Sequence, residues 1–301
     1  MCGIVGLFLK KPELEARLGE WLAPMLTGMG ERGPDSAGFA VYCPPAEGCT
    51  VKVTLHHPDE RYPWRQLWDD LALSLGARVE GAVRASHCVL MSDAPEDALR
   101  RALALRHPDV HLMGIGETIE IYKEKGRPED VAARFRLAEF QGSHSVGHTR
   151  MATESAVTTE HSHPFSTGLD LCLVHNGSLS NHNRLRLRLR RHGILFQTDN
   201  DSEVAAGYLT WRLGQGASLD DALEAALVDL DGFYTFAVGT RDGFAVLRDS
   251  FACKPAVLAE TDDWVAMASE YRSIAHLPGA DAARIWEPAP ATVYSWARQR
   301  A

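Results

Sequence analysis

The chain begins Met1-Cys2-Gly3-Ile4-Val5-Gly6, which places a cysteine directly after the initiator methionine. If that methionine is removed, a thiol and a free α-amine belong to one residue, Cys2. An α-amine titrates near pH 8, so it can take a proton from a neighbouring nucleophile near neutral pH. An N-terminal amine that activates its own side chain is an established catalytic arrangement. Alone, however, a cysteine at the start of an apolar strand is most often a buried core residue.

The composition is that of a globular protein, with 301 residues, 45% hydrophobic and 24% charged. A formal net charge of -9 disfavours nucleic acid and anionic membranes as general partners. No apolar run approaches the roughly 18 residues that span a bilayer, and no secretory signal pattern is present. No Cys/His spacing is typical of zinc. We therefore expect a cytoplasmic protein with no metal site.

Two stretches, 2–55 and 141–301, share one pattern of strands and helices, and a different pattern separates them. The apolar run Ile4–Leu9 predicts a strand, and apolar residues at helical spacing predict a helix over Pro12–Met29. In the region between the two stretches, 56–140, strands are expected at 85–91, 110–114 and 119–122, and helices at 94–106 and 128–135. A loop of this length inside a compact domain would be unusual. We predict an inserted α+β subdomain over 56–140 and a main domain formed by 2–55 and 141–301.

After the insertion, a strand over Leu169–Val174 ends at His175-Asn176-Gly177. Further elements are expected as helices at 181–192, 201–213 and 218–230, and as strands at 233–239, 244–248, 264–268 and 292–296. The first of these helices carries five arginines: Arg184, Arg186, Arg188, Arg190 and Arg191. In an acidic chain this favours a solvated face or a subunit contact over nucleic-acid binding.

Five short motifs follow Cys2 along the chain. They are Arg32-Gly33-Pro34-Asp35-Ser36-Ala37-Gly38, Gly147-His148-Thr149-Arg150-Met151-Ala152-Thr153, His161-Ser162-His163-Pro164-Phe165, His175-Asn176-Gly177-Ser178-Leu179-Ser180-Asn181 and Thr198-Asp199-Asn200-Asp201-Ser202-Glu203. Each is weak alone, because Arg-Gly-x-Asp and Asn-Gly are common turns. Asp201 by itself is most simply the N-cap of the helix that follows it.

In this order the motifs resemble the class II glutamine amidotransferases, the N-terminal-nucleophile glutaminases, from Cys2 to about Pro255. The resemblance implies an α+β fold: a four-layer αββα N-terminal-nucleophile hydrolase sandwich, here with the small α+β subdomain inserted. It also implies glutaminase chemistry. Cys2 would attack the carboxamide carbon of glutamine, and the Asn176 side chain and the Gly177 backbone N–H would stabilise the oxyanion.

The same resemblance assigns the ends of the substrate. Arg150 matches the arginine that binds the α-carboxylate, for which a planar guanidinium suits bidentate pairing. Asp201 matches the residue that holds the α-ammonium group. The other matched positions are Arg32, Gly33 and Asp35, which organise the N-terminus, and Thr153 and His163, which support the substrate site. We interpret His163 as structural, because the chemistry requires no histidine base.

Departures from the pattern narrow the identity. Glucosamine-phosphate synthase-type members carry tryptophan where this chain has Met151 and histidine where it has Glu154. The long insertion is more like the glutaminase domain of glutamate synthase. As a separate chain, it looks like the amidotransferase subunit of glutamate-synthase-like complexes, of which N-methylglutamate synthase is the member we would name. That implies no cofactor in this chain, and FMN and an iron–sulfur cluster on synthase partner subunits of a hetero-oligomer.

Several alternatives stay open at this point. The amide substrate is glutamine, which releases ammonia, or γ-glutamylmethylamide, which releases methylamine through the same thioester. A different hypothesis is a catalytically silent structural subunit, which a retained Met1 would favour because it converts the Cys2 amine into an amide. A third is a stand-alone γ-glutamyl amidase, because Arg150 and Asp201 read only the glutamyl end of a substrate.

Overall fold

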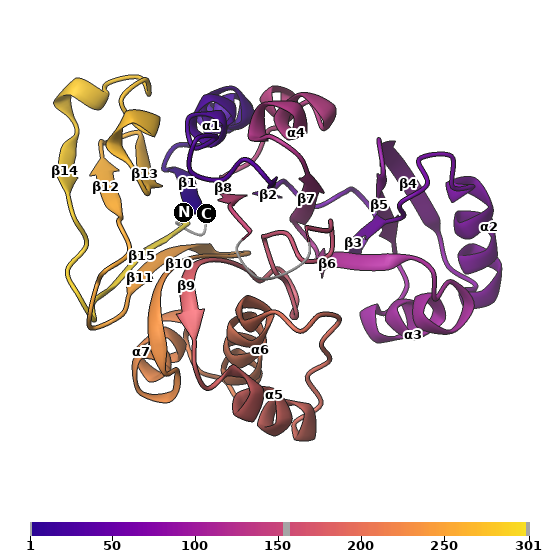
Figure 1. Ribbon diagram of the computed structural model, residues 1–301. Coiled ribbons are helices and arrows are strands. Elements are labelled where there is room, and N and C mark those ends of the chain that lie inside the picture. Colours follow the sequence, from indigo (N-terminus) through magenta and orange to yellow (C-terminus); the bar gives the residue numbers. More distant parts are fainter. Residues whose placement is uncertain (1, 153–156, 299–301) are drawn as a thin grey trace.

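The computed structural model of the chain describes residues 2–152 and 157–298 (Figure 1). Its largest sheet has seven strands and is antiparallel throughout, with Cys2 directly before its central strand, β1. In spatial order the strands are β14 (Arg284–Trp286), β12 (Val257–Glu260), β13 (Trp264–Ala268), β1 (Gly3–Leu9), β8 (His144–Arg150), β2 (Ser36–Tyr42) and β7 (Ile119–Lys125).

A second, four-stranded sheet packs face to face on the first. Its order is β15 (Val293–Ala297), β11 (Gly243–Arg248), β10 (Gly232–Thr240) and β9 (Cys172–Leu179). Ile4, Val174 and Phe244 belong to the apolar core between the two sheets. Glycine allows the closest approach: a Cβ at Gly6 would lie 2.6 Å from the ring of Phe244. The absence of a side chain at Gly6 on the large sheet therefore leaves room for the ring of Phe244 on the small sheet.

Helices cover both outer faces of this pair of sheets. The large sheet is covered by α1 (Leu18–Thr27) and α4 (Pro128–Arg134), with the short 3-10 turns η1 (Pro12–Arg17), η2 (Leu137–Glu139), η3 (Tyr271–Ser273) and η4 (Ala280–Ala282) around them. The small sheet is covered by α5 (His182–Arg191), α6 (Asp201–Gly214) and α7 (Leu219–Asp229) (Figure 1). The expected four-layer αββα sandwich is confirmed.

A third sheet forms a separate lobe beside the sandwich (Figure 1). Its order is β4 (Val79–Arg84), β5 (His87–Ser92), β3 (Val51–His56) and β6 (His111–Gly116), and it is covered by α2 (Trp64–Leu75) and α3 (Glu96–Arg106). The lobe has its own apolar core, which includes Leu67, Leu90 and Leu99. We call residues 51–116 the inserted lobe.

These limits differ from the 56–140 expected from the sequence. β7 pairs with β2 along its whole length, from Ser36↔Lys125 to Tyr42↔Ile119, and α4 packs on the core of the sandwich. Residues 117–140 therefore belong to the sandwich, whereas β3 belongs to the lobe. The sequence predicts a strand at 119–122 but none at 51–56, and in both places only the pairing partner decides which sheet contains the strand.

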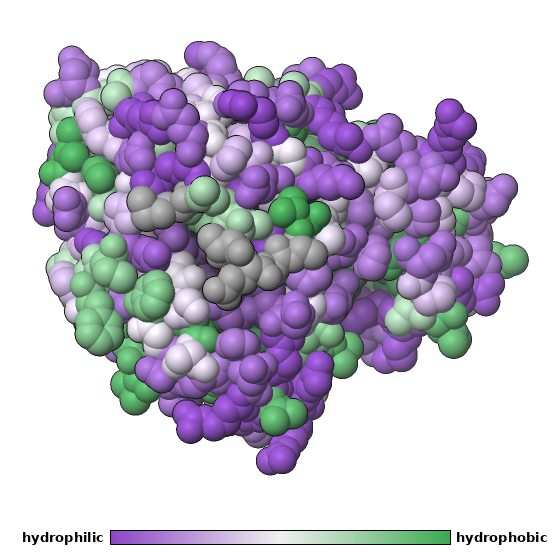
Figure 2. Space-filling view, in the orientation of Figure 1, coloured by the Kyte–Doolittle hydropathy of each residue, from purple (hydrophilic) through white to green (hydrophobic). Residues whose placement is uncertain are grey.

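The face seen in Figure 2 is mostly hydrophilic, with apolar residues in small separate groups. None of the helices in the described ranges, 2–152 and 157–298, is long and apolar enough to cross a membrane.

Candidate active site

The N-terminus is held at the end of a central strand. β1 lies between β13 and β8, and the Ile4 N–H donates to Ser269 Oγ at 2.9 Å while the Ser269 N–H donates to the Ile4 carbonyl at 2.9 Å. Cys2 is half-buried directly before this strand, and its Sγ lies 3.9 Å from the carbonyl oxygen of Met151. The nucleophile predicted from the sequence thus directly precedes a strand that is paired on both sides.

Arg32 lies against the backbone of Cys2. Its Nε donates to the Cys2 carbonyl oxygen at 3.1 Å, and its Nη1 donates to Glu270 Oε1 at 2.7 Å. The Arg32 guanidinium lowers the pKa of Glu270, so this carboxylate stays ionised as the partner of the arginine. Glu270 also pairs with Arg272, whose Nε lies 2.7 Å from Glu270 Oε2. Arg272 Nη1 in turn lies 2.9 Å from Oε2 of the exposed Glu31.

Gly33 and Asp35 bring the same loop onto the end of β8. A Cβ at Gly33 would lie 2.3 Å from the carbonyl carbon of Thr149, so only glycine permits this approach. The Asp35 N–H donates to the Arg150 carbonyl at 3.0 Å, and Asp35 Oδ2 accepts the Ala152 N–H at 2.8 Å. The loop therefore fixes the chain where β8 ends beside Cys2.

Asn176 and Gly177 lie on β9 of the facing sheet. The Asn176 side-chain amide donates to the Cys2 carbonyl oxygen at 3.2 Å. Gly177 has φ +154°, and a Cβ there would lie 2.0 Å from the Phe233 carbonyl oxygen on β10. This position thus accepts glycine alone, and it brings the β9 backbone and the Asn176 amide to the N-terminus.

The two charged groups predicted to bind substrate come from different layers. Arg150 is the last residue of β8 and is 6% exposed. Asp201 is the first residue of α6, and its Oδ2 accepts the Leu179 N–H at 2.9 Å. The N-cap is Asn200, whose side chain accepts the Ser202 N–H at 2.8 Å. The Asp201 carboxylate is therefore not used as the cap and is directed toward the end of β9 instead.

Three buried histidines pack together: His175 on β9, His148 on β8 and His163. The rings of His148 and His163 stack at 4.0 Å between centroids, and His163 Nδ1 accepts the His175 N–H at 3.3 Å. Ser202 Oγ joins this group to α6, because it lies 2.9 Å from His175 Nδ1, 3.3 Å from His163 Nε2 and 3.3 Å from Asp201 Oδ1. Burial lowers the pKa of His148 to about 3 and the pKa values of His163 and His175 below their usual range, so all three rings are neutral near pH 7.

A buried lysine fastens the segment that carries His163. Lys123 Nζ donates to the carbonyl oxygens of Glu160 at 3.1 Å, Ser162 at 2.8 Å and Pro164 at 3.2 Å. Burial lowers the pKa of Lys123 to about 8. One side chain on β7 thus satisfies three carbonyl groups of the 160–164 turn.

The structure brings Arg32 and Asn176 into contact with Cys2, and it places the loop with Gly33 and Asp35 against the end of β8, where Arg150 lies. Gly177 follows Asn176 on β9, Asp201 contacts the end of that strand at Leu179, and His163 packs against His148 and His175. Thr153, the remaining predicted site residue, lies outside the described residues, as do Met1 and Glu154. Sequence reasoning assigned no role to Glu270, Ser202 or Lys123. Ser202 lies in the motif 198–203, whereas none of the five motifs includes Glu270 or Lys123.

Within residues 2–152 and 157–298, no three His, Cys, Asp or Glu side chains are arranged to hold a metal ion. What the site does combine is a thiol, an amide donor directed at the same residue, a cation from β8 and a carboxylate from α6. A nucleophile beside fixed hydrogen-bond donors suits acyl transfer. Opposite charges at the two ends of a site suit a zwitterionic substrate.

The chain is similar in sequence to known proteins. Residues 148–276 match the glutamine amidotransferase domain family. The chain is 56% identical over 302 residues to the glutamine amidotransferase-like protein GlxB of Rhizobium meliloti, covering 100% of both chains. It is 29% identical to a putative glutamine amidotransferase of Methanothermobacter thermautotrophicus, covering 98% of this chain and 99% of that one.

Solved structures share the fold. The glutamine phosphoribosylpyrophosphate amidotransferase of B. subtilis superposes on 98% of this chain with a TM-score of 0.60 and 19% identity. The chain spans 49% of the length of that structure. At this level of identity the likeness shows the N-terminal-nucleophile amidotransferase fold.

Proposed function

Because the chain belongs to the class II glutamine amidotransferases, we propose that it is a glutaminase-type amidotransferase subunit whose nucleophile is Cys2. The observation that carries the proposal is the convergence on Cys2: Arg32, from the loop between α1 and β2, and Asn176, from β9, both donate to its carbonyl oxygen, at 3.1 Å and 3.2 Å. Such donors hold the reacting residue in a fixed orientation, which supplies a large part of the rate in acyl transfer.

The reaction begins once removal of Met1 exposes the α-amine of Cys2. This amine takes the thiol proton, and Sγ bonds to the γ-carboxamide carbon of glutamine to form a tetrahedral oxyanion. The C–N bond then breaks, the amine delivers the proton to the leaving ammonia, and a thioester remains. Water hydrolyses the thioester to glutamate and restores the thiol.

The surrounding residues supply the electrostatics. The Asn176 amide and the Gly177 N–H stabilise the oxyanion, while Arg150 binds the α-carboxylate and Asp201 the α-ammonium group. Asp201 lies directly after the loop 197–200, which Glu203 holds by accepting the N–H groups of Gln197 and Thr198, each at 2.8 Å. The position of the Asp201 carboxylate is therefore fixed in two ways: through the loop 197–200 that precedes it and through its hydrogen bond to β9.

The released amine needs an acceptor. We propose that it passes to synthase subunits of the glutamate synthase or N-methylglutamate synthase type, which would carry FMN and an iron–sulfur cluster. Support for this part comes from the motif set and from the long insertion between Gly38 and Gly147. In a complex of the second type, the amide is γ-glutamylmethylamide and the product is methylamine.

Glutamate release from glutamine and from γ-glutamylmethylamide, together with the intact mass of the purified chain, tests the proposal. We expect the mass to lack Met1, glutamate to form from at least one amide, and the Cys2→Ala variant to be inactive. Cys253→Ala removes another thiol, which is exposed, and is expected to keep full activity. Retention of Met1, or turnover by Cys2→Ala, would contradict the proposed nucleophile, and inactivity toward both amides would favour a structural subunit.

A further inference from the structure

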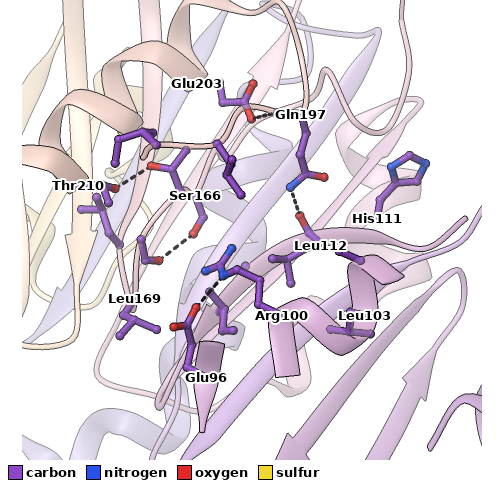
Figure 3. A pocket seen from close by; sticks show the side chains of 18 of the residues that line it. Glu96, Arg100, Leu103, His111, Leu112, Ser166, Leu169, Gln197, Glu203 and Thr210 are labelled. Carbon is purple, nitrogen blue, oxygen red and sulfur yellow. Dashed lines mark hydrogen bonds and ion pairs between the residues drawn. The ribbon is translucent and has the colours of Figure 1, made fainter. Parts of the chain in front are cut away.

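A cavity of about 860 Å³ lies in the seam between the inserted lobe and the sandwich (Figure 3). α3 and β6 of the lobe form one wall, and α6 with the loops 166–171 and 193–197 forms the other. This volume is within the range of sites that hold small organic ligands. The predicted site residues are not among those that line it in the described chain, so it is separate from the site at Cys2.

The walls of the cavity are mostly aliphatic. Leu103, Ile115 and Leu171 are buried side chains that line it. On the sandwich side, however, Leu169 is 59% exposed and Leu195 is 74% exposed. Apolar side chains at the seam between two packed units are normally covered by the opposite unit. Here the inserted lobe does not cover Leu169 and Leu195, so their apolar side chains are accessible to a ligand in the cavity.

One ion pair lies within this apolar lining. Arg100 Nε donates to Glu96 Oε1 at 2.6 Å, and both side chains project from α3 toward the loop that carries Ser166 and Leu169 (Figure 3). This guanidinium donates to Glu96 through Nε, and its Nη groups form no hydrogen bond within residues 2–152 and 157–298, so they can donate to an oxygen of a ligand. An Arg fork within an apolar pocket suits a carboxylate attached to an apolar body.

The inner end of the cavity touches the loop that leads to Asp201. Gln197 and Glu203 both line it, and the Gln197 side chain donates across the seam to the Leu112 carbonyl at 2.8 Å. The Glu203 carboxylate accepts the N–H groups of Gln197 and Thr198, each at 2.8 Å, as well as the Thr198 hydroxyl at 2.8 Å. A ligand that displaces Gln197 thus acts on a loop that ends one residue before Asp201.

We propose that this cavity binds a small carboxylate with an apolar body, and that its occupation changes the affinity of the Asp201 site for glutamine. The first half stands on the cavity alone, and the second half rests on the proposed function. The ligand carboxylate pairs with Arg100, its apolar body lies against the leucines, and the signal passes through Gln197 and Thr198.

Displacement of the fluorescent probe 8-anilinonaphthalene-1-sulfonate tests whether the cavity binds an apolar carboxylate. The two competing ligands are octanoate and 1-octanol, which have the same alkyl chain length but differ in charge. We expect octanoate to displace the probe more strongly than octanol. Arg100→Met should weaken octanoate about tenfold and leave octanol unchanged, because one charge-assisted contact is lost. Arg101→Met is the matched control, since Arg101 pairs with Asp97 at 2.7 Å on the same helix but does not line the cavity. Equal binding of both ligands, or an equal effect of both variants, would overturn the proposal.

A second pair of variants fills the cavity. Ala104 lines it, so Ala104→Trp should abolish probe binding, whereas Leu105, 83% exposed on the same helix and outside the lining, should tolerate Leu105→Trp. In the wild type, octanoate should change the KM for glutamine and leave kcat unchanged, and Ala104→Trp should remove that effect. A KM that does not respond to bound octanoate would overturn the coupling. Failure of the proposed function is distinguishable, because glutamate release would then be absent while octanoate still displaced the probe.

Discussion

The Asn176 side-chain amide donates to the carbonyl oxygen of Cys2 across 3.2 Å, although 174 residues separate them in the chain. This bond joins β9 of the small sheet to the residue before β1 of the large sheet. The N-terminus is therefore located by both sheets at once, and the amide lies beside the atoms that react in the proposed mechanism.

Asn176→Ala tests this relationship. We expect kcat for glutamate release to fall about 10²- to 10³-fold with a small change in KM, because the amide acts mainly on the oxyanion of the transition state. Asn181→Ala is the control, since the Asn181 side chain donates to the Asp229 carbonyl at 2.9 Å and has no contact with Cys2 in the described structure. Steady-state kinetics of both variants would reveal the difference, and equal losses would contradict the oxyanion role.

Glu270→Gln tests how Arg32 is positioned. Gln keeps one acceptor oxygen but carries no charge, so the guanidinium should be held less firmly against the Cys2 carbonyl. We expect kcat to fall about tenfold, the size of one weakened charge-assisted bond, while KM is unchanged. Glu31→Gln removes the other carboxylate that pairs with Arg272, 81% exposed, and should have no effect. A rise in KM without loss of kcat would argue against a positioning role.

Ser202→Ala tests the connection between the histidine group and Asp201. The hydroxyl contacts His175, His163 and Asp201 at 2.9–3.3 Å, so its loss should loosen the carboxylate. We expect KM for glutamine to rise about fivefold with kcat nearly unchanged, which corresponds to one net hydrogen bond. Ser218→Ala, in the capping box of α7, should lower stability and leave KM unaltered. An unchanged KM in Ser202→Ala would show that Asp201 is held without the hydroxyl.

Much of the sandwich could be predicted from the sequence, because its elements carry strong local patterns. The apolar run of β1, the glycine after α5 and the serine that caps α7 are signals read from neighbouring residues alone. The limits of the inserted lobe could not be predicted this way. β3 and β7 have similar local patterns, and their sheets differ only through pairing with strands far along the chain.

The candidate site likewise divides into residues that local motifs predict and residues that only long-range contacts place there. Its main residues could be found because each lies in a short motif whose order matches a known family. Glu270 was missed because its partner, Arg32, lies 238 residues away, and a charged residue in a loop is normally solvated. Lys123 was missed because a lysine in a strand predicts an exposed face, whereas here three carbonyl groups of one turn replace water around it.

Buried neutral histidines predict a specific acid sensitivity. His144 lies between the sheets, with its ring stacked on Tyr42 at 4.0 Å and its Nε2 2.9 Å from the Thr240 carbonyl. Burial lowers the pKa of His144 to about 3, against about 6.5 in an unfolded chain. Between these values the unfolded state binds more protons than the folded state, so stability falls as the pH falls. The contribution of neutral His144 to the free energy of unfolding is complete above about pH 6.5. Below that pH it declines by up to about 1.4 kcal/mol per pH unit.

His144→Gln removes this titration while its side-chain amide can still donate to the Thr240 carbonyl. Urea unfolding of wild type and variant at about pH 7, 6 and 5 should show a shallower fall of the unfolding free energy in the variant. Its disadvantage at pH 7 should therefore shrink toward pH 5. The exposed His276→Gln is the control and should follow the wild-type slope. Equal slopes for His144→Gln and the wild type would contradict the prediction, because they would mean that His144 has the same pKa in the folded and the unfolded chain.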